Sequence, residues 1–277
     1  MLSSNIIVAS HRRSGTHFTI DTIFNNFKNS YANKYINLDR IEVGHDKPSS
    51  KEVHEPPLKI NQFIDIVSSE SKIIKTHFLP SSLAKLHLQS EEEIKFINNL
   101  FTNTKIIYVY RNGIEVMSSL YIYMKYFNKE VNNMPFERFL QSTNDFDDNN
   151  LNRLQYWKLH ITEWQSFSKN NSNVLLLKYE DLLNQNIHVV KLISKFIGVD
   201  FPEEPIDVKY STTKNPYLKL YHKALQKLNI GSVKRTTITP GLKFKDNVEL
   251  FNKRARRIFL DEIGDFNNSL GFINDFN

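Results

Sequence analysis

The stretch NIIVASHRRSGTHFTIDTIFNNF, residues 5–27, decides the fold that the sequence predicts. It begins with a short apolar run typical of a buried strand, which the polar loop HRRSG follows. Apolar residues from Phe18 to Phe27 then recur at helical spacing. A strand, a loop and a helix in this order leave free backbone N–H groups and the positive end of the helix dipole at the loop. Such a loop favours a bound phosphate.

The loop residues Arg13, Ser14, Gly15 and Thr16 occupy the position of a phosphate loop. They do not form a Walker A motif, because that motif needs a lysine directly after its second glycine and Thr16 follows Gly15 here. An ordinary strand-to-helix turn, capped by Ser14 or Thr16, is the alternative interpretation.

Strand and helix patterns alternate along the rest of the chain. Further strands are expected at residues 72–77, 105–110 and 173–181, and helices at residues 91–101, 111–127, 151–167 and 187–198, the last closed by Gly198. This alternation predicts an α/β fold with a central parallel sheet, helices on both faces and ligands beyond the carboxyl ends of the strands. We expect one domain over residues 1–277, loops at residues 44–57 and 202–245, and a final basic helix around residues 248–263.

Composition narrows the function. The chain has 277 residues with 36 Lys and Arg against 30 Asp and Glu, a formal charge of +6 that suits an anionic ligand. It contains no cysteine, which excludes a disulfide framework and a thiolate nucleophile or metal ligand. No basic leader with a cleavage site opens the chain, and no window approaches eighteen apolar residues. We expect a cytoplasmic protein without a membrane span.

The second expected strand, in IIKTHFLP, carries a cation and a base near its end. Under period-two alternation Lys75 and His77 share one side of the strand and Thr76 faces the other. A lone histidine in an apolar run is more often a core residue than a catalyst. Here, however, three strand ends bring Arg13, His77 and Arg111 to one rim of the sheet, where unpaired cations are costly unless an anion binds.

The third strand ends in YVYRNG, and Arg111 leaves it at its carboxyl end. Ser119 follows eight residues later in the next helix, so the two residues share a face only if Arg111 lies on the preceding loop and reaches back. The planar fork of an arginine suits a phosphate. Taken alone, a surface arginine and a serine bonded to its own helix are the simpler interpretation.

In this order, RRSGT, KTHFLP, YVYRNGIEVMSS and LLLKYEDL resemble the sulfotransferase family, specifically the cytosolic type with a histidine base. The resemblance covers most of the chain. It implies an α/β domain related to the P-loop kinases that binds 3′-phosphoadenosine 5′-phosphosulfate (PAPS) and releases adenosine 3′,5′-bisphosphate (PAP). The implied cofactor-binding residues are Arg13, Ser14, Gly15, Thr16 and His17 for the 5′-phosphosulfate, Arg111 and Ser119 for the 3′-phosphate, and Tyr179 of KYED.

The same resemblance makes His77 the general base and Lys75 its companion cation. The segment VKRTTITPGLKF resembles the part of the family that closes over the 3′-phosphate and adenine, with Arg235 and Lys243 as contributors. This chain departs from the family at three points. Many members have a lysine in place of Arg13 and a hydroxyl residue in place of His17, and the usual Arg-Lys-Gly run is missing near the end. His17 either replaces the hydroxyl contact or is a second acid.

Sulfuryl transfer to a hydroxyl or amine needs a base for the acceptor proton, cations for the charge that builds on the bridging oxygen, and in-line positioning. The catalytic residues expected for these tasks are His77, Lys75 and Arg13, with no metal. The acceptor is expected to be a small molecule, a lipid or a sugar. A nucleic-acid partner is not expected, because the run NKRARR lacks interleaved aromatic residues. The alternative is a metal-dependent P-loop phosphotransferase that uses Glu180 and Asp181.

Overall fold

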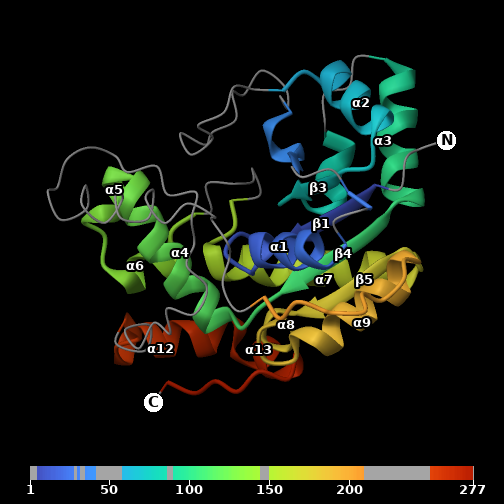
Figure 1. Ribbon diagram of the computed structural model, residues 1–277. Helices are drawn as coiled ribbons and strands as arrows, with labels where there is room; N and C mark the ends of the chain where they lie inside the picture. Colours follow the sequence, from blue (N-terminus) through green and yellow to red (C-terminus); the bar gives the residue numbers. More distant parts are fainter. Residues whose placement is uncertain are drawn as a thin grey trace, which may run out of the picture.

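A parallel five-stranded sheet forms the centre of the computed structural model, which describes residues 5–27, 30–31, 35–41, 58–85, 90–143, 150–208 and 250–276 (Figure 1). The strands are β1 (Ile6–Ser10), β2 (Ile36–Asn37), β3 (Ile73–Thr76), β4 (Lys105–Tyr110) and β5 (Val174–Lys178). Their order across the sheet is β2-β3-β1-β4-β5. The expected α/β architecture with a parallel sheet is confirmed.

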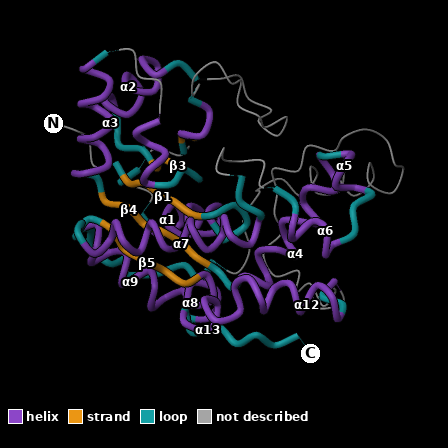
Figure 2. Tube along the Cα trace, turned by 180° about the vertical axis from the view of Figure 1, so that it is seen from behind, coloured by secondary structure: helices purple, strands orange, loops and turns teal. Residues whose placement is uncertain are grey.

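Helices cover both faces of this sheet, as the views from the front and from behind show (Figures 1 and 2). The helices are α1 (Thr16–Asn26), α2 (Ile60–Ser69), α3 (Glu91–Asn103), α4 (Gly113–Phe127), α5 (Lys129–Asn132), α6 (Phe136–Gln141), α7 (Arg153–Lys169), α8 (Tyr179–Asn184), α9 (Asn186–Ile197), α12 (Lys253–Phe259) and α13 (Asp265–Ser269). Short 3₁₀ turns η1 (Leu38–Arg40) and η2 (Pro80–Lys85) and a π-helical turn η3 (Leu260–Gly264) complete the described elements.

Strand β1 shows why the strands read as continuous apolar runs. Ile6 and Val8 pack with residues of α1 and α9, whereas Ile7 and Ala9 pack in the cluster on the opposite face with residues of α3 and α7. Successive side chains of a strand point to opposite faces, so a sheet covered on both sides needs apolar residues at every position. All five residues of β1 are accordingly buried.

The carboxyl ends of the three central strands lie together. The chain passes from β1 towards β2 and β3 and later returns to β4 on the other side of β1, so the strand order reverses at β1. Ala9 pairs with Thr76, and Ser10 pairs with Val109. Loops after β1, β3 and β4 therefore meet at a topological switch point, where parallel sheets of this kind bind their ligands.

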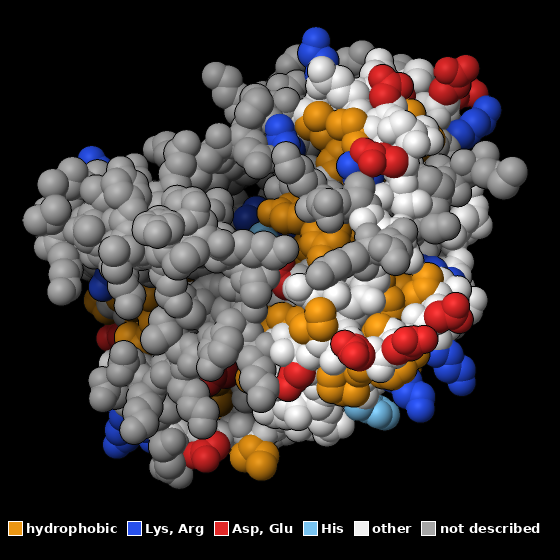
Figure 3. Space-filling model, in the orientation of Figure 1, with side chains coloured by type: hydrophobic (Ala, Val, Ile, Leu, Met, Phe, Trp, Pro, Cys, Tyr) orange, Lys and Arg blue, Asp and Glu red, His pale blue; other side chains and the backbone are white. Residues whose placement is uncertain are grey.

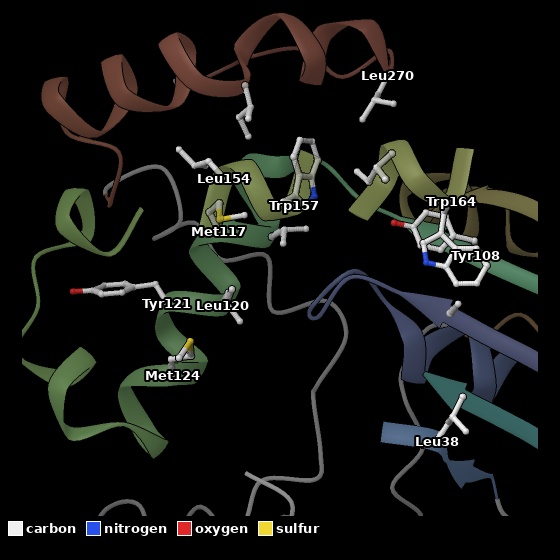
Figure 4. Packing of buried hydrophobic residues seen from close by; sticks show 14 of the residues in the cluster. Leu38, Tyr108, Met117, Leu120, Tyr121, Met124, Leu154, Trp157, Trp164 and Leu270 are labelled. Carbon is white, nitrogen blue, oxygen red and sulfur yellow. The ribbon is translucent and has the colours of Figure 1, made fainter. Parts of the chain in front are cut away.

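Helix α4, which carries Ser119, is fixed by aromatic and aliphatic packing. Met117 of α4 lies against Leu154 and Trp157 of α7, beneath the C-terminal helices (Figure 4). Tyr108 of β4 stacks on Trp164 of α7 with 5.2 Å between ring centroids. Phe259 of α12 and Ile263 of η3 belong to the same buried cluster, so the C-terminal elements pack against α4 and α7.

The structure departs from the expected elements in several places. Strand β2 and helices α2, α5 and α6 were not predicted. The strand expected at residues 173–181 ends at Lys178, because Tyr179 begins α8. The expected continuous final helix is interrupted: Asn252 accepts hydrogen bonds from the backbone N–H groups of Arg254 and Ala255 and so starts α12 afresh. Within the described ranges, no helix is both long enough and apolar enough to cross a membrane.

Candidate active site

The loop between β1 and α1 is closed tightly on itself. Ser14 N–H donates to the carbonyl of His11 at 3.2 Å, and the hydroxyls of Ser10 and Thr16 lie 2.5 Å apart. Gly15 has a φ of 109°, and a Cβ there would lie 2.3 Å from Cδ2 of Tyr179. Glycine is therefore required at this position both by its backbone conformation and by the neighbouring ring.

Two buried donors at this loop have no hydrogen-bond partner within the described part of the chain. They are the hydroxyl of Ser14 and Nε of Arg111. The first N–H groups of α1 also lack an intrahelical acceptor, as at every helix start. Buried polar groups left unpaired cost free energy, and an anion bound at the loop would offer acceptor oxygens to such donors. The residues present thus fit the phosphates of PAPS.

Arg13 links the loop to the two residues expected at the 3′-phosphate. Its Nε donates to Oγ of Ser119 at 3.0 Å, and its carbonyl accepts from Nη1 of Arg111 at 3.4 Å. Arg111 lies on the loop before α4, as was required for it to approach Ser119. Within the described residues its side chain contacts Arg13, Glu115 and Tyr179, and only Arg13 joins it to Ser119. The guanidinium of Arg13 also lies 4.9 Å from the ring centroid of Tyr123, a contact that the sequence did not suggest.

Tyr179 lies between this loop and Arg111. The guanidinium carbon of Arg111 is 4.4 Å from the centroid of the Tyr179 ring, and Nη2 of Arg111 donates to the carboxylate of Glu115 at 3.0 Å. Burial raises the pKa of Tyr179, although the nearby Arg111 charge lowers it. Tyr179 is therefore a neutral aromatic platform that holds Arg111 over the loop.

His77 lies directly after β3, beside the end of β1. Its Nδ1 is 2.7 Å from the carbonyl oxygen of Ser10, and because a carbonyl can only accept, Nδ1 carries the hydrogen. The lone pair of the neutral ring is then on Nε2. Burial, and next the charge of Lys75, hold the pKa of His77 well below 6.5, while Asp39 acts in the opposite direction. A neutral imidazole with a free lone pair is what a general base requires.

Lys75 is buried and paired with a carboxylate that the sequence did not single out. Its Nζ lies 3.2 Å from Oδ2 of Asp39 and 3.4 Å from Oδ1 of Asn37. Oδ1 of Asp39 accepts from Oγ1 of Thr76 at 3.1 Å and from the backbone N–H of His77 at 2.7 Å. Strand alternation separates Thr76 from Lys75, yet both contact Asp39, because this residue lies past the end of β2 where strand pairing has stopped.

His17, in the first turn of α1, is hydrogen-bonded through Nε2 to the hydroxyl of Tyr35 at 3.1 Å. Burial lowers its pKa to about 3, with smaller effects in the same direction from Lys75 and Arg13. The imidazole is therefore neutral near pH 7. This favours a hydrogen-bonding role for His17 over that of a second acid.

Another histidine, His160 of α7, contacts the backbone of His77 and was missed in the sequence. Its Nε2 lies 3.1 Å from the backbone carbonyl of His77, and its Nδ1 lies 2.9 Å from the hydroxyl of Tyr108. It is completely buried. A polar residue on the apolar stripe of a helix was the signal available in the sequence, since such a residue needs partners inside the protein.

Three of the other residues named from the sequence are Arg235, Lys243 and Glu180. Arg235 and Lys243 fall outside the described residues. Glu180 accepts the backbone N–H of Asn112 at 3.1 Å, and burial raises its pKa. Across the described ranges, no group of three or more His, Asp or Glu residues is arranged to hold a metal ion. In the space-filling view, a basic side chain and a histidine are visible together in a hollow near the middle of this face (Figure 3).

Comparison with known proteins decides the family. A model of the sulfotransferase domain matches residues 3–235. The chain belongs to the sulfotransferase family. The motifs of this sulfotransferase-family protein had predicted that membership. The family uses PAPS as its sulfuryl donor, which agrees with the expected cofactor.

Curated relatives include several sulfotransferases. Rabbit amine sulfotransferase is 27% identical over 99% of this chain and 84% of its own length. Mouse sulfotransferase 1A1 is 31% identical over 50% of this chain and 41% of its own length. A flavonol sulfotransferase-like protein of Flaveria bidentis is 30% identical over 50% of this chain and 40% of its own length. The last two alignments thus span less than half of the relatives.

Solved structures of two related proteins show the same fold. Mouse sulfotransferase SULT7A1 complexed with PAP superposes with a TM-score of 0.53 at 16% identity, covering 97% of this chain and 88% of that one. Retinol dehydratase in complex with androsterone and PAP gives a TM-score of 0.54 at 19% identity, with 96% and 82% covered. At these identities the likeness establishes the fold alone, and it confirms the expected P-loop-kinase-like architecture.

Proposed function

We propose that the protein transfers a sulfuryl group from PAPS to a hydroxyl or amine, with His77 as the general base. One observation carries this proposal: the hydrogen bond from Nδ1 of His77 to the Ser10 carbonyl leaves the lone pair of Nε2 available directly beside the phosphate loop. A base in this position can take the proton of a nucleophile that attacks a group held by the loop.

The donor would be held by the loop and by the residues around Arg13. Ser14 and the N-terminus of α1 are suited to the 5′-phosphosulfate, because their donors are unpaired at a helix start. Arg111 and Ser119 are suited to the 3′-phosphate, and Tyr179 to the nucleotide beside Arg111. When bound, PAPS supplies the activated sulfuryl group.

The protein's own groups divide the remaining work. His77 accepts the acceptor proton at Nε2. Lys75 and Arg13 offset the negative charge that develops on the bridging oxygen, and the low pKa of His77 keeps the ring neutral until the proton arrives. These groups need no metal ion and no covalent intermediate with the protein.

The acceptor is proposed to be a small molecule, a lipid or a sugar, and the protein is proposed to work in the cytoplasm. One relative is named an amine sulfotransferase, and retinol dehydratase has been solved with retinol and with androsterone. Amines and hydrophobic alcohols therefore belong beside phenols and sugars in a screen with labelled PAPS.

Nucleotide preference tests the proposal. Calorimetry should show that PAP binds much more tightly than AMP or ATP, because Arg111 and Ser119 would contact its 3′-phosphate. Arg111→Ala should weaken PAP binding by about 1.5–3 kcal/mol, roughly tenfold to hundredfold, and leave AMP binding almost unchanged. Arg254→Ala, on the exposed side of α12, is the matched control and should change neither. Equal affinity for ATP and PAP would contradict the proposal.

Metal dependence separates sulfuryl transfer from the phosphotransferase alternative. Excess EDTA should leave transfer from PAPS intact, because arginine and lysine already neutralise the transferring group. A strict Mg²⁺ requirement, with activity lost in Glu180→Gln, would favour a phosphotransferase.

A further inference from the structure

Asp39 contacts the last two residues of strand β3 and the residue that follows them. It lies in the 3₁₀ turn η1, directly after β2, and its two carboxylate oxygens accept bonds from three consecutive residues. These are Nζ of Lys75 at 3.2 Å, Oγ1 of Thr76 at 3.1 Å and the backbone N–H of His77 at 2.7 Å. Two of the three residues are the proposed base and its companion cation.

The Asp39–Lys75 ion pair is almost completely buried, with side-chain exposures of 8% and 7%. A pair of this kind adds little net stability, because taking both charges out of water costs about as much as their attraction returns. Although burial alone would raise the pKa of Asp39, the charges of Lys75 and Arg12 and the hydrogen bond from the backbone N–H of His77 hold it well below its usual value. The carboxylate is therefore charged near neutral pH, where it attracts the ammonium group of Lys75 and favours protonation of His77.

His77 is anchored from three sides, and Asp39 provides one of these contacts. Its backbone N–H is held by Asp39, its Nδ1 by the Ser10 carbonyl, and its backbone carbonyl by Nε2 of His160. Within the part of the chain that the structure describes, its Nε2 makes no hydrogen bond. The three contacts together fix the direction of the one ring nitrogen that stays free.

We propose that Asp39 is a positioning residue of the sulfuryl-transfer site, which fixes the backbone of His77 and holds the ammonium group of Lys75 beside it. This assignment rests on the proposed function of His77 and Lys75. Asp39 contacts neither the donor nor the acceptor and acts through the two residues that do.

The titration of His77 measured by NMR tests this assignment without any assay of activity. The groups that face His77 are Lys75 on β3, Asp39 on η1, Arg12 on the loop after β1 and the neutral His160 on α7. Asp39 is the negative charge among them. In Asp39→Asn the protonation midpoint of the His77 ring should therefore fall below that of the wild type. A merely structural role predicts the opposite sign, because a loosened strand end would hydrate the ring and raise its pKa towards 6.5.

Kinetics provide the second measurement. In Asp39→Asn we expect turnover with PAPS to fall roughly tenfold to hundredfold, as when a supporting contact to a reacting group is lost, and PAP affinity to stay within about threefold of wild type. Glu70→Gln removes an exposed carboxylate that pairs with Lys72, and this control should move neither the midpoint nor turnover. A midpoint that rises, or turnover within about twofold of wild type, would overturn the assignment.

If Asp39→Asn does not fold, Asp39→Glu keeps the test open. It retains the charge and displaces the carboxylate by one methylene, so the His77 midpoint should stay near wild type while turnover falls by about tenfold or more. Unchanged turnover in this variant would overturn the positioning role. If the wild-type protein transfers no sulfuryl group from PAPS, the proposed function itself fails, whereas the NMR midpoints still report on Asp39.

Discussion

Gly15 has no room for a side chain in the loop between β1 and α1. In Gly15→Ala the backbone would pay about 1–2 kcal/mol for a left-handed conformation, and the new Cβ would displace the Tyr179 ring that supports Arg111. We expect a lower free energy of unfolding and a clear loss of PAP affinity, measured by urea denaturation and calorimetry.

Gly198, at the end of α9, is the matched control. It also has a positive φ, of 74°, but an added Cβ would meet nothing within 4 Å. Gly198→Ala should therefore lose about 1 kcal/mol of stability and keep its PAP affinity. Equal PAP binding by the two variants would show that the Gly15–Tyr179 contact does not shape the nucleotide site.

At the scale of single residues, the sequence identifies groups whose chemistry and position along a strand are distinctive. His77, Lys75 and Arg111 follow from strand ends on one rim, together with a family resemblance. Asp39 could not be found in this way, because it acts across the pairing of β2 with β3, on a residue 38 positions later in the chain. The tautomer of His77 depends on its hydrogen bond to the Ser10 carbonyl. This contact is made only once β1 and β3 have paired, so the sequence alone does not reveal it.

Helix α4 begins at a junction with the C-terminal region. Oδ1 of Asn267 accepts the backbone N–H of Gly113 at 2.9 Å, and Asn267 is completely buried. Asn267→Ala would leave that N–H without a partner and should lower the free energy of unfolding by about 1–3 kcal/mol. Because Arg111 lies two residues before the helix start, PAP should also bind more weakly to this variant.

The neighbouring Asn268 is exposed, so Asn268→Ala should stay within about 0.5 kcal/mol of wild type and bind PAP normally. Thermal or urea denaturation together with calorimetry compares the two variants. Wild-type stability in Asn267→Ala would show that the C-terminal segment does not hold the start of α4.

At the scale of elements, the spacing of apolar residues predicts those strands and helices that are long enough to show a repeating pattern. Strands β1, β3 and β4 and helices α1, α3, α7 and α9 appear close to their expected ranges. Strand β2 has two residues, which is too few for any alternation, and it exists only because β3 offers it a partner. The start of α12 likewise depends on one capping side chain, that of Asn252, which stands inside a sequence pattern that is otherwise helical. Strand order is a property of the assembled sheet and was not predicted.

At the scale of the whole molecule, buried histidines make stability depend on pH. Burial lowers the pKa of His160 to about 4 and that of His11 well below 6.5. Below pH 6.5 the unfolded chain binds protons at these positions that the folded chain does not. Stability is therefore complete above pH 6.5 and falls as pH falls, by up to about 1.4 kcal/mol per pH unit for each histidine.

Urea denaturation at pH 7.5, 6.5 and 5.5 measures this dependence. We expect most of the loss between pH 6.5 and 5.5, and a smaller loss over that interval in His160→Gln. His188→Gln, which changes an exposed histidine, should follow wild type. Equal stability at pH 7.5 and 5.5 would contradict a native state with neutral buried histidines.

The most direct test of His77 as the general base is the rate of label transfer from PAPS, at saturating donor and with the best acceptor of the screen, in wild type and in His77→Ala. We expect turnover to fall roughly a hundredfold to ten-thousandfold in the variant, the usual effect of removing a positioned base. Its PAP affinity and melting temperature should stay near those of wild type, because in the proposed role His77 takes a proton from the acceptor and does not bind the phosphates. A folded His77→Ala protein whose turnover stays within about threefold of wild type would contradict the assignment of His77 as the base.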